Sequence, residues 1–283
     1  MKNNRTLWIV IVVVLAALGA CCAATAGLVL LGGWQWGNAW IDGGRTETTG
    51  QFAKAFDVRG PVKLSLDAPV GDVTIKASAE PRVAILATKR AWGSNTARAQ
   101  QILDGITINA DQAGDQVRIR VTGLTGVTNA PRSPQVDFVI TVPKDTAVKV
   151  DSRVGRLTIA GTSGDVAITA DVGDVTLADV TPAEQLQIET RVANIELSGV
   201  LASEASYRLT SDIGRIALRL PTASAFKIDA RSDVGDVRVD FTVTGRSSRQ
   251  GFVSKEVRGE VGTNPATALY LRSRIGEITV RAE

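Results

Sequence analysis

Apolar and polar residues alternate over most of the chain from Val62 onwards. A period of two places every second side chain on the same face of an extended strand, so this pattern predicts β-strands with one buried face. The first alternating apolar pairs are Leu64 and Leu66, Val73 and Ile75, and Val83 and Ile85. Further strands are predicted at "ITINA" (106–110), "QVRIRVT" (116–122) and "QVDFVITV" (135–142).

One segment has a helical period instead. In "SNTARAQQILDG" (94–105), Ser94 or Asn95 is a suitable N-cap and Gly105 a suitable stop. The apolar residues Ala99, Ile102, Leu103 and Ile106 follow the spacing i, i+3, i+4, i+7. The sequence therefore predicts one short helix in the N-terminal part of the β-rich region.

From about residue 147 the pattern becomes a regular repeat. A small polar run, a Val-Gly or Ile-Gly step and a new alternating strand recur, as in "SRVGRLTI" (152–159), "ADVGDVTL" (170–177) and "RSDVGDVRVDF" (231–241). The residues at the glycine position are Gly155, Gly173, Ala193, Gly214, Gly235 and Gly276, at intervals of 18, 20, 21, 21 and 41. The last interval is close to two repeats, and residues 244–264 are predicted to form a loop or excursion within that last pair.

Each repeat contains two short strands and cannot bury its own apolar face. Stacked repeats can bury a continuous core, so we predict an all-β fold, a β-solenoid of stacked two-strand coils. Glycine is expected at a corner between the two strands because it tolerates backbone angles that penalise other residues. We expect the Val before it to face inward and the Asp after it to begin the next strand. "RVANIEL" (191–197) lacks this glycine, which suggests a looser corner at Ala193.

Charged residues flank the predicted corners. We expect successive coils to stack in sequence order, so that equivalent residues lie about 4.8 Å apart and form rows. The row before the corner Val or Ile is Arg153, Asp171, Arg191, Asp212, Asp233 and Arg274; the row after the glycine is Arg156, Asp174, Asn194, Arg215, Asp236 and Glu277. Opposite signs mostly follow one another, so we expect two exposed charge ladders that fix the stacking register.

The N-terminal segment predicts a membrane anchor. Leu7 to Leu31 contains 25 residues without a charge, and about 20 suffice to cross a bilayer as a helix. Lys2 and Arg5 precede it and the next basic residue is Arg45, so the positive-inside rule places the N-terminus in the cytoplasm. We therefore predict a tail and transmembrane anchor helix over 1–36, a linker over 37–58 and an extracytoplasmic repeat domain over 59–283, in a single-pass protein of the cell membrane.

Two alternatives for the N-terminus stay open. The segment could be a cleaved signal sequence, although its apolar run is longer than the roughly 7–15 residues typical of one. "LGAC" (18–21) resembles a bacterial lipobox, which would place a lipid on Cys21. Against this, the apolar run continues beyond Cys21, where mature lipoproteins usually become polar.

Composition excludes several classes of chemistry. The chain has no histidine, which removes histidine triads, histidine bases and histidine metal ligands. Its two cysteines, Cys21 and Cys22, are adjacent and form no CxxC pair. The net charge is only +3 and no basic stripe is visible, so we expect no nucleic-acid partner. The nine-residue spacing of Asp165 and Asp174 occurs once, too seldom for a calcium-binding β-roll. We expect no catalytic, cofactor-binding or metal-binding residues, and no enzymatic activity.

The repeat resembles a widespread family of bacterial domains of unknown function named putative adhesins, whose repeats read roughly "tsnGdIti". The matching segments are "VGDVTI" (70–75), "SGDVAI" (163–168), "VGDVTL" (172–177), "VGDVRV" (234–239) and "SRIGEITV" (273–280). The resemblance implies a β-helical, often membrane-tethered ectodomain with roles in surface adhesion or envelope-stress sensing. We expect a binding or structural module at the cell surface, whose ligand could be cell-wall material, lipid or protein. The alternative is an envelope-stress sensor acting through a membrane partner.

Overall fold

The structure is a computed structural model that describes residues 46–124, 134–250 and 254–283. Within these residues no helix is long and apolar enough to cross a membrane. The predicted transmembrane segment, Leu7–Leu31, lies outside the described residues, as does Cys21. Residues 44–283 form one structural unit, and the description below concerns this unit alone.

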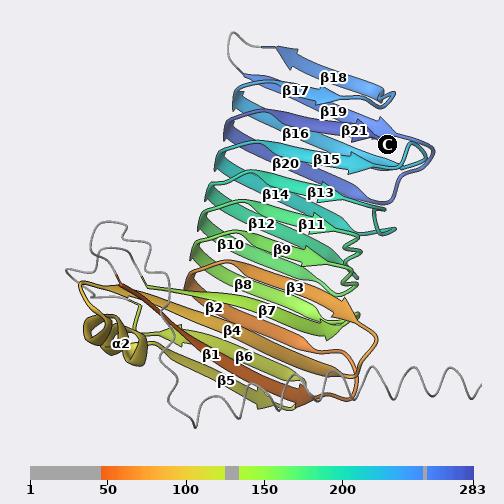
Figure 1. The fold of residues 1–283 in the computed structure, drawn as a ribbon. Coiled ribbons are helices and arrows are strands. Elements are labelled where there is room, and N and C mark those ends of the chain that lie inside the picture. Colours follow the sequence, from red (N-terminus) through yellow and green to blue (C-terminus); the bar gives the residue numbers. More distant parts are fainter. Residues whose placement is uncertain (1–45, 125–133, 251–253) are drawn as a thin grey trace, which may run out of the picture. The chain divides into compact units, whose positions relative to one another are not determined.

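Two large sheets face each other across the core (Figure 1). The first sheet contains, in spatial order, β1 (Thr46–Asp57), β4 (Arg82–Gly93), β7 (Gln135–Pro143), β3 (Val73–Ser78), β9 (Leu157–Ala160), β11 (Val175–Ala178), β13 (Ile195–Ser198), β15 (Ile216–Leu220), β21 (Ile278–Ala282) and β17 (Val237–Val239). The second contains β18 (Thr244–Gln250), β19 (Lys255–Val261), β16 (Phe226–Val234), β20 (Ala268–Ile275), β14 (Ser206–Ile213), β12 (Gln185–Val192), β10 (Val166–Val172), β8 (Ala147–Val154), β2 (Lys63–Val70), β6 (Gln116–Thr122) and β5 (Thr107–Ala113).

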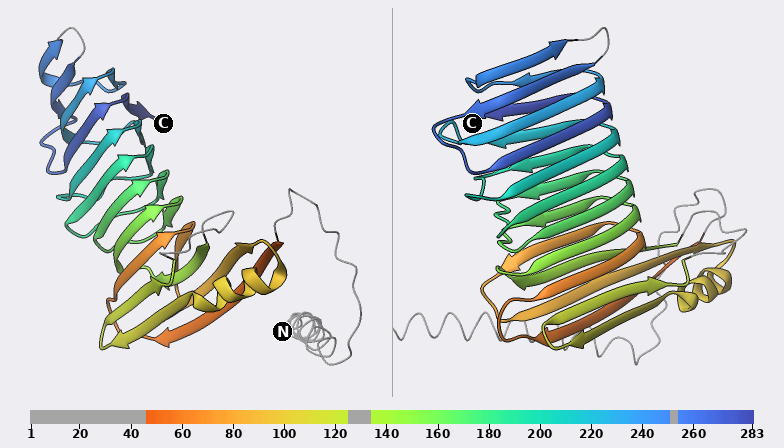
Figure 2. Two further views of the ribbon diagram at one scale, coloured as in Figure 1. Left: turned by 90° about the vertical axis from the view of Figure 1, so that its left-hand side faces the viewer. Right: turned by 180° about the vertical axis from the view of Figure 1, so that it is seen from behind.

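The predicted solenoid is confirmed. Each repeat contributes one strand to each sheet, and equivalent strands of neighbouring repeats pair in parallel, as β10 does with β8 and β12. Figure 2 shows these coils stacked on one another from two further sides. The alternating apolar side chains point between the sheets, and Ile195, Ile216 and Val237 are examples that are buried.

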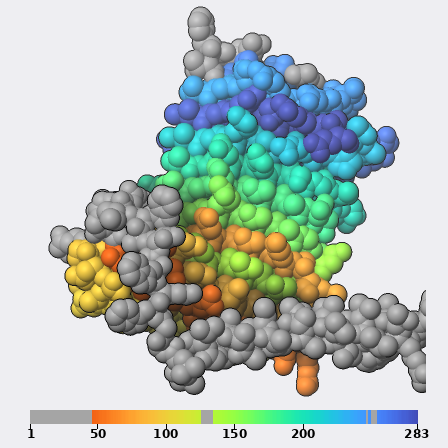
Figure 3. Space-filling view, viewed as in Figure 1, coloured from red at the N-terminus to blue at the C-terminus, as the bar shows by residue number. Residues whose placement is uncertain are grey.

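The order of the last coils differs from the sequence order. The C-terminal strands β20 and β21 lie between the β14–β15 coil and the β16–β17 coil, with Ile275 in register with both Ile213 and Val234. In Figure 3 the dark blue C-terminal residues accordingly form a band between teal and lighter blue bands. Residues 244–264 are not simply a loop, because β18 and β19 form an antiparallel hairpin on β16 before the chain returns. The prediction of stacking in sequence order is therefore wrong at this end.

The N-terminal end of the stack is closed by antiparallel strands. The strand pairs β1–β4 and β5–β6 are antiparallel, so the outermost strands do not continue the solenoid. The predicted linker over 37–58 is wrong where the structure describes it, because Thr46–Asp57 forms β1. This edge strand keeps most of its side chains exposed, so it has no clear apolar alternation, and backbone pairing with β4 holds it.

The predicted helix is confirmed as α2 (Thr96–Gly105). The Asn95 side chain caps it by accepting a hydrogen bond from the Arg98 N–H at 2.8 Å. Its buried face, Ala99, Ile102 and Leu103, packs on β4 and β1.

Candidate functional site

The repeated Val-Gly-Asp step is a corner between the two sheets. The corner glycines have φ values between +133° and +150°, in the region that favours glycine: Gly71, Gly155, Gly173, Gly214, Gly235 and Gly276. A Cβ on Gly173 would lie 2.0 Å from the carbonyl oxygen of Gly155, the corner residue of the neighbouring coil. Glycine is thus required both by the backbone angles and by the close approach of stacked corners.

Ala193 stands at a corner where the other repeats have glycine. It lacks a positive φ, yet its N–H donates to the Ile213 carbonyl at 2.9 Å, as the glycine N–H groups do at their own corners. The following Ile195 N–H donates to the Arg215 carbonyl at 2.8 Å. The corner therefore keeps its backbone hydrogen bonds, and the prediction of a looser corner at Ala193 is wrong.

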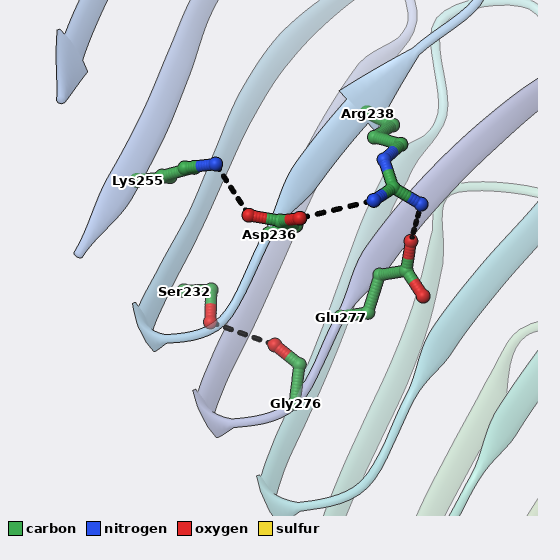
Figure 4. A network of polar contacts seen from close by, with 6 residues as sticks. All are labelled: Ser232, Asp236, Arg238, Lys255, Gly276 and Glu277. Carbon is green, nitrogen blue, oxygen red and sulfur yellow. Dashed lines mark hydrogen bonds and ion pairs between the residues drawn. The ribbon is translucent and has the colours of Figure 1, made fainter. Parts of the chain in front are cut away.

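Small hydroxyl residues fill the inner side of the corner. The buried Ser211 hydroxyl donates to the Ala193 carbonyl at 3.0 Å, and the buried Ser232 hydroxyl donates to the Gly276 carbonyl at 2.7 Å (Figure 4). A buried carbonyl left without a donor costs about 1–3 kcal/mol, so these hydroxyls stabilise the turn. Ser273 makes the same contact with the Gly214 carbonyl at 3.2 Å, so these hydroxyls explain the serine that stands three residues before the corner in these coils.

The Asp or Asn after the glycine joins one coil to the next. Asp72 Oδ1 accepts a hydrogen bond from the Arg156 N–H at 2.8 Å, and Asn194 Oδ1 accepts one from the Arg215 N–H at 3.0 Å. Asp174 Oδ1 binds the Asn194 N–H and side-chain amide. These side chains bind the neighbouring backbone, so the repeated aspartate is explained by stacking.

The Val or Ile before the corner glycine faces outward. Its side chain is 44–50% exposed in six stacked coils: Val154, Val172, Val192, Ile213, Ile275 and Val234. The prediction that this residue faces inward is wrong, because the alternation ends where the chain turns. In the coils of Ser211 and Ser232 the inside of the corner is already occupied by the serine hydroxyl and the neighbouring corner carbonyl. We call this row the aliphatic ridge.

Both predicted charge rows exist beside the aliphatic ridge. Because β20 lies between β14 and β16, the row on the sheet containing β8 to β16 has the spatial order Arg153, Asp171, Arg191, Asp212, Arg274, Asp233. Its signs alternate strictly, which the sequence order had concealed. Arg191 and Asp171 lie 3.2 Å apart, and Arg274 and Asp212 lie 3.1 Å apart. We call this row the alternating row.

A polar network joins the last coils (Figure 4). Arg238 binds Asp236 at 3.0 Å and Glu277 at 2.6 Å, and Lys255 of the β18–β19 hairpin also binds Asp236. The Lys255 ammonium lowers the pKa of Asp236 below its usual value, with a smaller effect from Arg238. The β16–β17 coil is thus connected to the hairpin on one side and to the inserted β20–β21 coil on the other, by charge as well as by strand pairing.

A groove lies on the outer face of the second sheet, across β6, β2, β8, β10 and β12. Its volume is about 310 Å³, and short side chains create the hollow: Ser65, Ala147 and Ala167. Long polar side chains line it, among them Lys63, Arg118 and Lys149, on three adjacent strands. Ser65 is in register with Arg118 on one side and Lys149 on the other.

The cations of the groove have few partners. Lys63 and Arg118 are exposed and form no ion pair with the described residues, and Lys149 lies 3.9 Å from the carboxylate of Asp151. The acidic residue of the groove, Asp165, has one carboxylate oxygen occupied by the N–H groups of Glu184 and Gln185, at 2.8 and 3.0 Å. The groove therefore presents three cations and a partly apolar floor. The sequence did not single it out, because its residues belong to strands distant along the chain.

The family described as Toastrack DUF4097 matches residues 62–249. This chain belongs to that family. The match runs from the first coil to the β18 strand and so contains most of the solenoid. No curated protein matches.

Solved structures with low sequence identity are also similar. A putative cell adhesion protein from Clostridium sporogenes is 12% identical, covers 83% of this chain and 100% of its own, and has a TM-score of 0.48. A putative adhesin from Bacteroides fragilis is 12% identical over 82% of this chain and 97% of its own, with a TM-score of 0.45. A putative lipid binding protein from Parabacteroides distasonis is 10% identical over 82% and 95%, with a TM-score of 0.26.

Proposed function

We propose that this protein is a membrane-anchored, extracytoplasmic binding module that holds an anionic envelope component in the groove of the second sheet. The observation that carries the ligand class is the convergence of Lys63, Arg118 and Lys149 on three adjacent strands around one hollow. The anchor is supported by the 25 uncharged residues from Leu7 to Leu31 and by Lys2 and Arg5 before them.

The chemistry of the groove favours phosphate or carboxylate groups carried on a larger molecule. Three cations with few close partners raise the local concentration of anions, and the short side chains leave room for a sugar or an acyl segment. Each exposed ion pair contributes only about 0–1 kcal/mol, so recognition depends on several contacts at once. A repeating anionic polymer or an anionic lipid surface supplies them.

Binding by the full chain tests this role. We expect the full chain to bind at least one of two probes. The first is a soluble phosphate-bearing glycopolymer, and the second is a lipid vesicle in which about a fifth of the lipid is anionic. The variant with Lys63→Gln, Arg118→Gln and Lys149→Gln should bind at least tenfold more weakly, which corresponds to about 1.4 kcal/mol. A matched control with Lys76→Gln, Arg208→Gln and Lys227→Gln removes the same charge from exposed positions outside the groove. Equal losses in both triple variants would show that net charge, and not the groove, is responsible.

The orientation is tested separately in cells. Protease added to wall-stripped cells should digest residues 59–283 and leave a short anchored fragment. Protection of the domain in wall-stripped cells whose cytoplasmic membrane is intact would overturn the extracytoplasmic location. If labelled palmitate is incorporated into the wild type and not into Cys21→Ser, the protein is anchored by a lipid on Cys21 and not by a helix.

A further inference from the structure

The aliphatic ridge is a continuous apolar feature on the surface of the solenoid. Its six side chains are in register on successive coils, from Val154 to Val234, and extend over about 24 Å at the spacing of β-strands. Each of them precedes a tight corner between the two sheets, and these corners form the column at the left of Figure 1. Stacking on their neighbours covers about half of each side chain, and the other half stays exposed.

Charges border the aliphatic ridge on both sides. On one side lies the alternating row, Arg153, Asp171, Arg191, Asp212, Arg274 and Asp233. On the other side lies the row that follows the corners, Arg156, Asp174, Asn194, Arg215, Glu277 and Asp236. An apolar centre with a charged rim is the usual composition of a protein–protein contact. The order of the charges then determines which partner fits.

We propose that two copies of this chain pair through their aliphatic ridges in antiparallel orientation. The twofold axis crosses the ridge between Val192 and Ile213, and the alternating row of one copy faces the alternating row of the other. The row has six charges of alternating sign, so it begins with a positive charge and ends with a negative one. When two copies lie antiparallel, the first position of one row faces the last position of the other, and every facing pair is oppositely charged. Arg191 faces Asp212 of the second copy, Asp171 faces Arg274, and Arg153 faces Asp233.

The parallel arrangement fits less well. It would bring the alternating row of one copy against the row that follows the corners in the second copy. Three of its six facing pairs then carry like charges: Arg153 with Arg156, Asp171 with Asp174, and Asp233 with Asp236. In the antiparallel pair the second row faces itself, and the one like-charged combination is Asp174 with Glu277, where Arg238 already neutralises Glu277. Charge complementarity therefore selects the antiparallel pair.

The pair should be weak because a single row of six half-exposed side chains is a narrow contact, whereas stable complexes bury roughly 800 Å² per partner. It should be sensitive to salt because exposed charges are screened within about 10 Å at 0.1 M salt. The antiparallel orientation places the β1 ends of the two solenoids at opposite ends of the pair. If the chain is anchored at its N-terminus, as proposed above, such pairs connect copies on two facing membranes.

A charge-swap experiment on the full chain tests the pairing. Donor- and acceptor-labelled samples in a neutral detergent are mixed at low salt, and energy transfer reports pairing. Wild type should pair with wild type. Arg191→Asp should not pair with itself, because the introduced carboxylate would face Asp212 of the second copy, and Asp212→Arg should not pair with itself for the corresponding reason. The mixture of Arg191→Asp with Asp212→Arg should regain energy transfer, because both facing pairs are again opposite.

The controls keep this result specific. Lys76→Asp changes the charge by the same amount on an exposed residue of β3 outside both rows, and should pair like wild type. Association through the apolar N-terminal segment would be equal in all variants and insensitive to the swap. Three results would overturn the antiparallel pair. Energy transfer could be the same in all variants, it could be absent in wild type at low salt, or it could fail to recover in the mixture of the two variants. None of these outcomes involves the groove, so the proposed ligand is tested independently.

Discussion

The hydroxyl of Ser232 donates a hydrogen bond to the carbonyl oxygen of Gly276 at 2.7 Å, although 44 residues separate them in the chain. Ser232 belongs to the coil that precedes the β18–β19 hairpin, and Gly276 to the coil that follows it. Ser211 likewise donates to the corner of the coil nearer to β1, at Ala193, so the Ser232 contact places the final coil on the β1 side of the β16–β17 coil, between it and the β14–β15 coil. This order makes the charges of the alternating row alternate strictly, and it is the basis of the proposed pairing.

Gly276→Ala should be strongly destabilising. The glycine has a φ of +150°, and an added Cβ would lie 2.0 Å from the Gly214 carbonyl oxygen, so neither the backbone nor the neighbour can accommodate it. We expect a loss of about 2–4 kcal/mol in the free energy of unfolding, measured by urea denaturation. Gly114→Ala has a positive φ but open space around it, and should cost about 1 kcal/mol. Equal losses at the two positions would contradict the close stacking of the corners.

Ile216 and Ala217 are a matched pair for testing the faces of a strand. Ile216 is 0% exposed, and Ala217 points to the outer surface of β15. Ile216→Asn buries an amide without partners and removes apolar contacts, which should cost about 3 kcal/mol or more in thermal or urea melts. Ala217→Asn should change the free energy of unfolding by less than about 1 kcal/mol. Similar losses would mean that the inward and outward faces are assigned wrongly.

The pKa of Asp236 predicts a dependence of stability on acid pH. Because Lys255 lowers this pKa in the folded protein, the unfolded chain binds a proton more readily than the folded one. The stabilisation is present above the unfolded pKa of about 3.9 and is lost as the pH falls through the folded value. Asp236→Asn should therefore melt at a lower temperature than wild type at pH 6, and the difference should shrink at about pH 2. A difference that is the same at both pH values would exclude the ion pair as its cause.

Asp171→Arg tests the alternating row within a single molecule. It would place three guanidinium groups side by side, the new one between Arg153 and Arg191, and remove the ion pair between Asp171 and Arg191. The cost should be at most about 1 kcal/mol at low salt and smaller at high salt, because these groups are exposed. Thermal melts at high dilution separate this effect from pairing. Thr169→Arg on the same strand faces Asp151 and Glu189 and should not destabilise the fold. A loss that is independent of salt would contradict an electrostatic role for the row.

The sequence by itself determined the local elements of this protein. The period of two marked the strands, as at Leu157 and Ile159, because a strand exposes alternate faces and the buried face must be apolar. The repeat of about 20 residues predicted the stacking, since one coil cannot bury its own core. Gly105 and a cap at Ser94 or Asn95 marked the ends of the helix, because capping depends on neighbouring backbone groups, and the structure selects Asn95.

Only the tertiary structure decided which coils are neighbours and which side chains stay exposed. The inward faces of the repeats are nearly equivalent, so periodicity cannot distinguish the observed order from stacking in sequence; the β18–β19 hairpin and the return of β20 decide it. The outward direction of Val172 depends on what fills the inside of the corner, and that includes a carbonyl of another coil. The groove formed by Lys63, Arg118 and Lys149 depends in the same way on strands that are distant in the chain and meet only when the sheet forms.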